Sequence, residues 1–309
     1  MWFGPAQQYT TAAGVITTAK LPYRPDLPPL VVNKGTAWHC SSFSVLQSIL
    51  QNQEVWSTRW DVTNDSSEAR HGLQFLENSW KDLYVAGEVH EETDQILRSL
   101  GLIKDYMERY DEVTLFCASR TRDDLTQWRL YGRGPASVSI GLDMGVELVP
   151  QVDHLPITAK RSSQTGWPWL KVVYTERQKL LLARRFVREL NYSSKYEGLD
   201  PADFLMLSVL TVLNMKHQQF SAEKEVRCVS ISSGIRLRTT GKAGQTYVAW
   251  RGVPTLKGDG ASNRLPLPIT EIVLPPQATI DHFVAVSAAL NEAGLDYVPV
   301  SWSSNPYRW

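Results

Sequence analysis

Two glutamates, Glu223 and Glu225, stand two positions apart at the start of a segment whose pattern predicts a β-strand. Residues two apart in a strand point to one face of the sheet, so both carboxylates should share a face, with Arg227 next in the row. Val226 and Cys228 fall on the other face, which predicts a half-buried strand. Two like charges this close raise the pKa of one carboxyl, which suits acid–base chemistry. The row therefore either lines a cleft or is neutralised by Arg227 or by a basic helix.

A second candidate group is His39-Cys40-Ser41-Ser42, which ends a short predicted strand just before a helix. Ser42 can cap that helix. Ser41, Ser42 and the first N–H groups of the helix offer donors to an anion or a ribose, and His39 adds a donor or acceptor. The alternative is a histidine satisfied by local backbone. Cys40 and His39 should not act as a pair, because adjacent strand residues point to opposite faces.

The elements that must position these groups follow from hydrophobic periodicity. The pattern predicts helices in the acidic stretch from about 65 to 112, around Trp128 and Tyr131, over 175–190, from Pro201 to Met215 with Asp200 as its cap, and over 279–293. It predicts strands at 36–42, 55–58, 113–119, 137–143, 171–174, 246–251, 269–274 and 297–302. Short strands with interspersed helices, not in strict alternation, indicate an α+β fold. Residues 1–33 are rich in proline and predict an extended arm, followed by one domain over 34–309.

Charge is unevenly distributed in a chain whose formal net charge is zero. Residues 51–124 hold 16 acids and 8 bases, a net charge of −8, and residues 155–255 hold 16 bases and 7 acids, a net charge of +9. Either the two parts neutralise each other, or the basic 155–255 region meets a polyanion such as RNA or DNA, or an acidic partner protein. The three cysteines suggest buried thiols in a reducing compartment. Because we find no signal peptide and no apolar run of about 18 residues, we expect a cytoplasmic protein without a membrane partner.

Several short motifs together resemble an uncharacterised family of bacterial proteins, and the resemblance covers most of 36–309. The motifs are His39-Cys40-Ser41-Ser42, Val55-Trp56, Asn64-Asp65-Ser66-Ser67-Glu68, Phe116-Cys117-Ala118-Ser119, Trp128-Arg129-Leu130-Tyr131, Glu223-Lys224-Glu225-Val226-Arg227 and Ser303-Ser304-Asn305-Pro306-Tyr307-Arg308.

This pattern is in turn similar to ADP-ribosyltransferases, and that similarity implies a split β-sheet core flanked by helices, with NAD as substrate and no metal. It implies that His39, Ser41 and Ser42 contact the NAD ribose, that Trp128 or Tyr131 stacks on nicotinamide, and that Glu225, with Glu223 beside it, performs the chemistry. His39 is followed by Cys40-Ser41 where the family usually has Gly-Thr or Gly-Ser. The similarity also implies a macromolecular acceptor, which includes nucleic acids, a role as a toxin, in a toxin–antitoxin pair or in antiviral defence, and an inhibitory protein partner.

Two other functions stay open at this point. One is a non-catalytic binding module in which the carboxylate row only forms ion pairs. The other is a metal-dependent nuclease, with Asn64, Asp65 and Glu68 as ligands together with Asp123 and Asp124. Asn-Asp pairs more often cap turns than bind metals.

Overall fold

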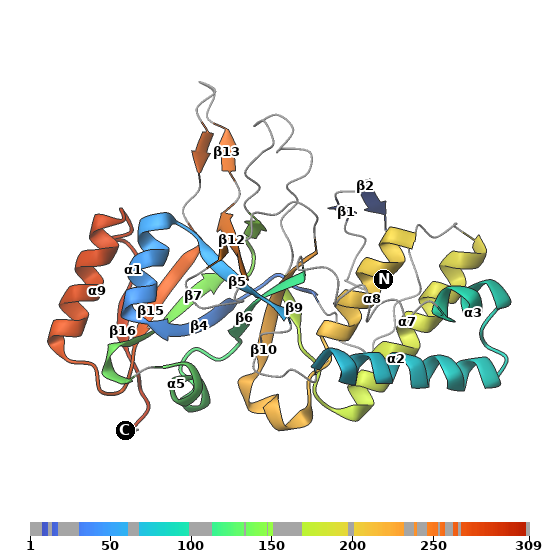
Figure 1. The fold of residues 1–309 in the computed structure, drawn as a ribbon. Coiled ribbons are helices and arrows are strands. Elements are labelled where there is room, and N and C mark those ends of the chain that lie inside the picture. The colour runs from blue at the N-terminus through green and yellow to red at the C-terminus, as the bar shows by residue number, and fades with distance from the viewer. Residues whose placement is uncertain are drawn as a thin grey trace.

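The computed structural model describes residues 8–11, 14–17, 31–60, 68–98, 113–132, 134–146, 148–150, 169–196, 201–231, 238–239, 246–252, 254–256, 262–264 and 267–306. Over these residues it combines helices with a large, mostly antiparallel sheet, which confirms the predicted α+β class. Helices α2, α3, α7 and α8 gather on one side of the molecule, and α1 and α9 lie at the opposite end of the sheet (Figure 1).

The described helices and strands have the following bounds. The helices are α1 (Phe43–Asn52), α2 (Glu68–Val85), α3 (Glu91–Arg98), α5 (Leu125–Tyr131), η2 (Gly134–Ala136), α7 (Glu176–Tyr196), α8 (Pro201–Leu213), η3 (Gln218–Glu223) and α9 (Ile280–Glu292). The strands are β1 (Gln8–Thr11), β2 (Gly14–Thr17), β3 (Val31–Val32), β4 (Thr36–Ser42), β5 (Val55–Arg59), β6 (Val113–Ser119), β7 (Ser137–Asp143), β8 (Leu148–Pro150), β9 (Trp169–Lys171), β10 (Glu225–Ile231), β11 (Arg238–Thr239), β12 (Thr246–Gly252), β13 (Pro254–Leu256), β14 (Ser262–Arg264), β15 (Ile269–Leu274) and β16 (Val300–Trp302).

Strand β6 is where the main sheet divides. Its whole length pairs with β10, from Ser119 opposite Glu225 to Val113 opposite Ile231. Its other edge is shared: β4 pairs with it only at Trp38 opposite Ser119. Strand β5 pairs with β6 only at Thr58 opposite Leu115 and at Arg59 opposite Thr114. The edge of β6 from Phe116 to Ala118 therefore lies between two diverging strands, and a gap opens there in the sheet.

Helix α1 joins the two diverging strands and begins where β4 ends. Ser42 caps it, as predicted, because its Oγ accepts the backbone N–H of Val45 at 3.3 Å. The helix buries Leu46, Ile49 and Leu50 against the sheet. Burying three apolar side chains stabilises this junction by several kcal/mol, at about 1.5 to 3 kcal/mol each. The β4–α1 junction is thus a rigid support for His39.

The acidic and basic segments pack together. Helices α2 and α7 lie side by side on the flank of the sheet (Figure 1). Arg184 pairs with Asp82 at 3.2 Å, and Arg188 pairs with Glu88 at 2.9 Å. The interpretation that the two parts of the chain neutralise each other therefore holds for these helices, and part of the predicted basic surface is already paired. Residues 155–168, 197–200, 232–237, 240–245 and 253 of the 155–255 region lie outside the described residues.

Three sequence predictions need correction, and others fall on residues outside the described part. Strand β10 is buried on both faces, not on one, because Arg227 is as buried as Val226. Strand β9 covers Trp169–Lys171 and ends before most of the predicted 171–174. In the predicted N-terminal arm, β1 and β2 form a hairpin and β3 pairs with β9 in the main sheet. Asn64, Asp65 and Asp200 lie outside the described residues.

Within the described residues, we find no helix with the length and apolar character to cross a membrane.

Asp123 holds the C-terminal segment against α5. Its carboxylate accepts the indole N–H of Trp128 at 2.7 Å, the hydroxyl of Ser303 at 2.7 Å and the backbone N–H of Ser304 at 2.7 Å. Burial raises the pKa of Asp123, but these donors outweigh burial and lower the pKa overall. Asp123 is thus a structural anchor in the described residues.

We expect Asp123→Asn to lower the free energy of unfolding by about 1 to 3 kcal/mol at neutral pH, because hydrogen bonds to a charged acceptor are lost. The folded-state pKa of Asp123 is lowered, so its contribution is complete above the unfolded-state pKa and disappears as the pH falls through the folded-state value. Urea unfolding from neutral to acidic pH should therefore show the two proteins converging at low pH. A constant difference across that range would contradict this role.

Candidate functional site

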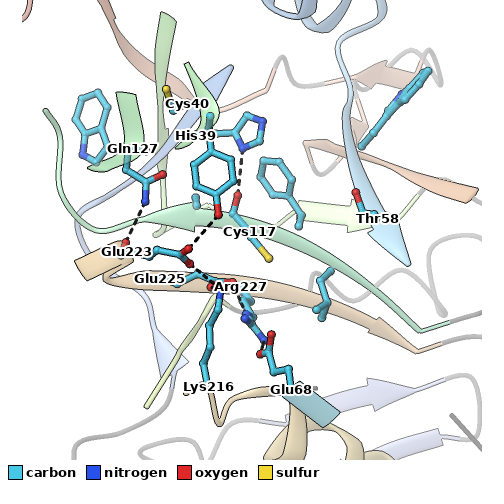
Figure 2. A pocket seen from close by; sticks show the side chains of 16 residues that line it. His39, Cys40, Thr58, Glu68, Cys117, Gln127, Lys216, Glu223, Glu225 and Arg227 are labelled. Carbon is cyan, nitrogen blue, oxygen red and sulfur yellow. Dashed lines mark hydrogen bonds and ion pairs between the residues drawn. The ribbon is translucent and has the colours of Figure 1, made fainter. Parts of the chain in front are cut away.

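A cavity of about 200 Å³ lies in the gap between β4, β5 and β6. Strand β4 contributes Trp38, His39 and Cys40 to its walls, and Trp56 of β5 and Phe116 of β6 add two more aromatic rings. Figure 2 shows charged side chains from α2, β10 and the segment before β10 on the opposite side. The cavity thus combines aromatic walls with a charged floor.

Lys216 joins the two glutamates at the floor of this cavity. Its Nζ donates to Oε2 of Glu223 at 2.6 Å and to Oε2 of Glu225 at 2.8 Å, and all three side chains are buried. Burial lowers the pKa of Lys216, but the Glu225 carboxylate reverses this and raises it. Lys216 therefore carries a positive charge between two carboxylates. No local sequence pattern singles out Lys216, which directly follows Met215, the residue that forms an isolated bridge with Val173 after α8.

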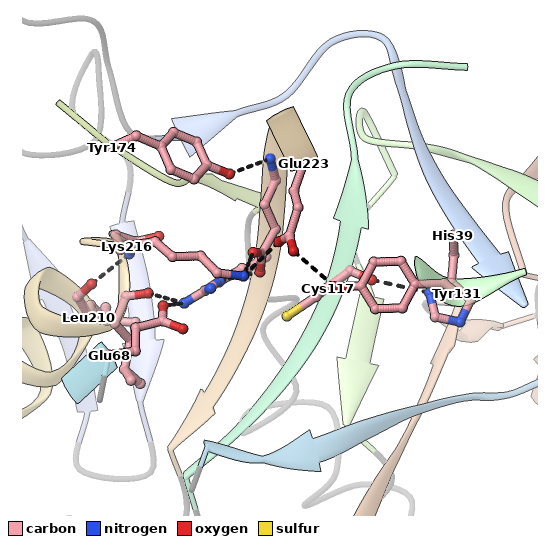
Figure 3. A network of polar contacts seen from close by, with 12 residues as sticks. His39, Glu68, Cys117, Tyr131, Tyr174, Leu210, Lys216 and Glu223 are labelled. Carbon is pink, nitrogen blue, oxygen red and sulfur yellow. Dashed lines mark hydrogen bonds and ion pairs between the residues drawn. The ribbon is translucent and has the colours of Figure 1, made fainter. Parts of the chain in front are cut away.

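Arg227 extends the same network away from the cavity floor. Its Nε donates to Oε1 of Glu225, and its Nη1 donates to Oε1 of Glu68 and to the backbone carbonyl of Leu213. Arg227 is 1% exposed, so these bonds form out of contact with water. The predicted alternative for Glu225, an ion pair with Arg227, is thus present. Figure 3 shows the chain of contacts from Glu68 to Tyr131.

Three carboxylates face two cations in this network, namely Glu68, Glu223 and Glu225 against Lys216 and Arg227. When all five are ionised, the sum of −3 and +2 is a net charge of −1. Burial raises the pKa of Glu225, but Arg227 and Lys216 outweigh burial and lower it to about 2. The prediction of a raised pKa in the Glu223/Glu225 pair is therefore wrong for Glu225; the pKa that burial raises is that of Glu68, which is not in that pair. An uncompensated negative charge in a buried site favours a cationic ligand.

Glu223 and Glu225 reach the same site by a turn and not by strand alternation. Glu223 ends the 3₁₀ helix η3, and β10 begins only at Glu225. Lys224 between them has a left-handed backbone with φ 45° and ψ 45°. This conformation is uncommon for a residue other than glycine and costs about 1 kcal/mol or more. The prediction that one strand carries both carboxylates is wrong, although both do face the cavity.

Tyr131 and Gln127 connect α5 to this turn. The Tyr131 hydroxyl donates to Oε1 of Glu223 at 3.2 Å, and Gln127 Nε2 donates to the Glu223 backbone carbonyl at 3.4 Å. On the other side, the Tyr174 hydroxyl accepts the backbone N–H of Glu225 at 2.8 Å. Glu225 therefore has each carboxylate oxygen bonded to a cation, whereas Oε1 of Glu223 has a neutral, longer bond on the cavity side.

His39 lies on the aromatic side of the cavity. Its Nδ1 is 3.1 Å from the backbone carbonyl of Cys117, on the edge of β6 that neither β4 nor β5 covers. Because a carbonyl can only accept, Nδ1 carries the proton and Nε2 is the acceptor in the neutral ring. Burial lowers the pKa of His39, which favours this neutral form. The ring also contacts Phe116, at 5.0 Å between ring centroids.

The structure brings together some predicted site residues and not others. His39, Tyr131, Glu223 and Glu225 all line the cavity. Ser41 and Ser42 do not line it, and Ser42 caps α1. Trp128 does not line it either: it is 1% exposed and packs with Trp38, Cys40 and Val273 beneath α5. Tyr131 is therefore the candidate aromatic from this turn.

The described residues contain no group of three or more His, Cys, Asp and Glu side chains arranged to hold a metal ion. Glu68, a ligand in the nuclease interpretation, is paired with Arg227, and Asp124 caps α5 through a 2.7 Å bond to the backbone of Thr126. Asn64 and Asp65 lie outside the described residues. The described candidate ligands are thus used by the fold itself.

None of the three cysteines forms a disulfide, and Cys40 and Cys228 are buried. Burial raises the pKa of Cys40 to about 12, so its thiol stays protonated.

No protein-family model, curated protein or solved structure matches this chain. The function must therefore be argued from the site alone.

Proposed function

We propose that this protein cleaves the nicotinamide–ribose bond of NAD and transfers the ADP-ribosyl group to a nucleophile, which we take to be on a macromolecule. The observation that carries the proposal is the net negative charge on the floor of an aromatic-walled cavity. NAD presents a planar, positively charged nicotinamide ring, and bond cleavage moves positive charge onto the ribose. A site with this composition favours both species over a neutral or anionic ligand.

The reaction needs one bond broken and one formed at C1′ of the ribose. Nicotinamide leaves with the bonding electron pair, and the acceptor atom bonds to C1′ and gives up its proton. A carboxylate beside C1′ stabilises the oxocarbenium charge that develops between these events. We assign this role to Glu223, because it lines the cavity and its Oε1 accepts from the neutral Tyr131 hydroxyl, while Glu225 is held by two cations.

Lys216, Glu225 and Arg227 then act as positioning residues. Lys216 fixes Glu223 through the 2.6 Å ion pair, and Arg227 fixes Glu225. Cys117 presents its carbonyl to His39, which leaves the His39 Nε2 to accept a hydrogen bond from a ribose hydroxyl. Tyr131 provides an aromatic face beside Glu223. Each proposed role thus uses a group that lines or supports one cavity.

The proposal is tested by incubating the protein with NAD and measuring free nicotinamide. Release that continues in the presence of a chelator supports the proposed transferase, because the mechanism uses no metal. A non-catalytic binding module, favoured by the Glu225–Arg227 pair, predicts an NAD-dependent rise in melting temperature without release. If NAD causes no nicotinamide release and no shift in melting temperature, with a panel of protein and nucleic-acid acceptors present, the proposal that the protein uses NAD is ruled out.

A single substitution, His39→Asn, separates the contact of His39 with Cys117 from its contact with the cavity. The amide nitrogen of asparagine can replace Nδ1 and keep the bond to the Cys117 carbonyl, but asparagine has no group at the position of Nε2. We expect His39→Asn to fold normally and to weaken NAD binding about tenfold, the loss expected for one hydrogen bond. Unchanged NAD affinity in folded His39→Asn, measured by calorimetry, would contradict the assignment of Nε2 to the ribose.

A further inference from the structure

A second cavity, of about 500 Å³, lies on the other side of the segment that carries Lys216 and Glu223. It is lined by His71 of α2, by Glu176 and Lys179 of α7, and by His217 and the first residues of η3. It shares no lining residue with the first cavity. The proposed NAD chemistry does not use it.

Lys179 is an unusual side chain in this second cavity. It is 1% exposed, and its Nζ lies 2.6 Å from Nε2 of His71 and 5.0 Å from the ring centroid of Phe75. In the part of the chain that the structure describes, no carboxylate oxygen lies within 4.0 Å of this Nζ. Buried ammonium groups are almost always paired with an acid, because desolvating a charge is costly. Among the described residues, Lys179 is therefore a buried cation without an ion-pair partner, although Glu176, one helical turn earlier, is close enough to raise its pKa.

The hydrogen bonds around Lys179 leave donors for a ligand. An ammonium group only donates, so His71 accepts through Nε2, and two N–H groups of Lys179 have no acceptor among the described residues. His217 accepts the backbone N–H of Gln219 at its Nδ1, at 3.3 Å, so the proton of its neutral ring is on Nε2. The His71 and His217 rings lie 5.7 Å apart. Donors from α7 and from η3 thus meet at one cavity.

We propose that this cavity binds a phosphoryl group of a small phosphorylated ligand. A phosphate has several acceptor oxygens and at least one negative charge, which matches a buried ammonium with two open donors and a neighbouring imidazole N–H. Burial lowers the pKa of Lys179, and a bound anion would offset that cost. Glu176, which also lines the cavity, disfavours negative charge on its side, so the ligand should place its phosphoryl end at Lys179.

The site is tested by isothermal titration of the full chain with inorganic phosphate, and with 5′-AMP to distinguish a nucleotide from the free anion. We expect saturable binding of one phosphate, weakened about ten- to a hundredfold in Lys179→Met, which removes the charge-assisted bonds. Lys81→Met is the matched control, because Lys81 is exposed on α2, and it should bind phosphate like the wild type. The absence of saturable phosphate binding, or equal affinity in folded Lys179→Met, overturns the proposal.

His217→Asn provides a second test that does not depend on a buried lysine. His217 is exposed, and asparagine is a good helix N-cap, so η3 should keep its cap. We expect phosphate affinity to fall about tenfold, and an unchanged affinity would contradict the proposal. Glu223→Gln should bind phosphate normally. Phosphate binding in a protein that does not cleave NAD would therefore refute the proposed function while supporting this site.

Discussion

Replacing Glu223 with glutamine is expected to reduce nicotinamide release from NAD at least a hundredfold and to leave the fold intact. The loss follows if the carboxylate stabilises the developing positive charge, since removing one such electrostatic contact typically costs about a hundred- to a thousandfold in rate. The glutamine carbonyl can still accept from Lys216, and the amide N–H can donate to the Tyr131 hydroxyl in place of the lost bond. Its neutral side chain also removes the surplus charge, because two carboxylates then face two cations.

The measurement is initial-rate nicotinamide release, with thermal melting to show that the variant folds. Glu271→Gln is the matched control, because Glu271 is also ion-paired, to Arg122, but does not line the cavity. It should release nicotinamide at the wild-type rate. If folded Glu223→Gln keeps wild-type activity, Glu223 does not contact the reacting ribose.

Glu225→Gln distinguishes the two glutamates. Glu225 bonds both cations, so its neutralisation affects both Arg227 and Lys216. We expect this variant to lose activity together with stability, whereas Glu223→Gln loses activity alone. Equal stability of the two variants in urea would argue against the positioning role of Glu225.

The largest effect on stability is expected for Arg227→Met, which should lower the free energy of unfolding by about 3 to 5 kcal/mol. The substitution removes the only described cation bonded to Glu68 and one of two bonded to Glu225, and it leaves the Leu213 carbonyl without that donor. Three buried carboxylates would then face Lys216 alone, a net charge of −2. Removing one partner of a buried pair is costly because the other charge stays behind, away from water.

Denaturant unfolding of a double-mutant cycle measures this coupling. Adding Glu68→Gln to Arg227→Met removes one stranded charge, so the double variant should be more stable than the sum of the single effects predicts. Arg188→Met is the control, because its pair with Glu88 is exposed on both sides and should contribute less than about 1 kcal/mol. Additive single effects in the cycle would mean that Glu68 and Arg227 do not depend on each other for stability.

Much of the secondary structure could be predicted from the sequence, because local patterns determine it. Strands β6, β7 and β15 have the predicted bounds, and Ser42 caps α1 as expected. The sequence also singled out His39, Glu223 and Glu225, which do line one cavity. These predictions succeeded because apolar periodicity, capping residues and closely spaced charged residues are visible in a few neighbouring positions.

Other features depend on contacts between distant parts of the chain. The gap in the sheet exists because β10 occupies one edge of β6 and β4 and β5 share the other, and no local pattern reports strand order. No local sequence pattern distinguishes Lys216 from the other lysines. Its role comes from its position between Glu223 and Glu225 in space. Trp128 was predicted to be a candidate for stacking on nicotinamide, but it is packed in a buried cluster beneath α5.

The sequence by itself determined which residue types and local elements this protein contains, including the carboxylate pair at Glu223 and Glu225. Only the tertiary structure decided what those carboxylates face. Burial of the network makes each charge depend on its neighbours, so the pKa of Glu225 falls to about 2 where spacing alone predicted a raised value for one of the pair. The physical reason is that ionisation in a protein interior is set by desolvation and by the nearest charges in space, which residue spacing along the chain does not specify.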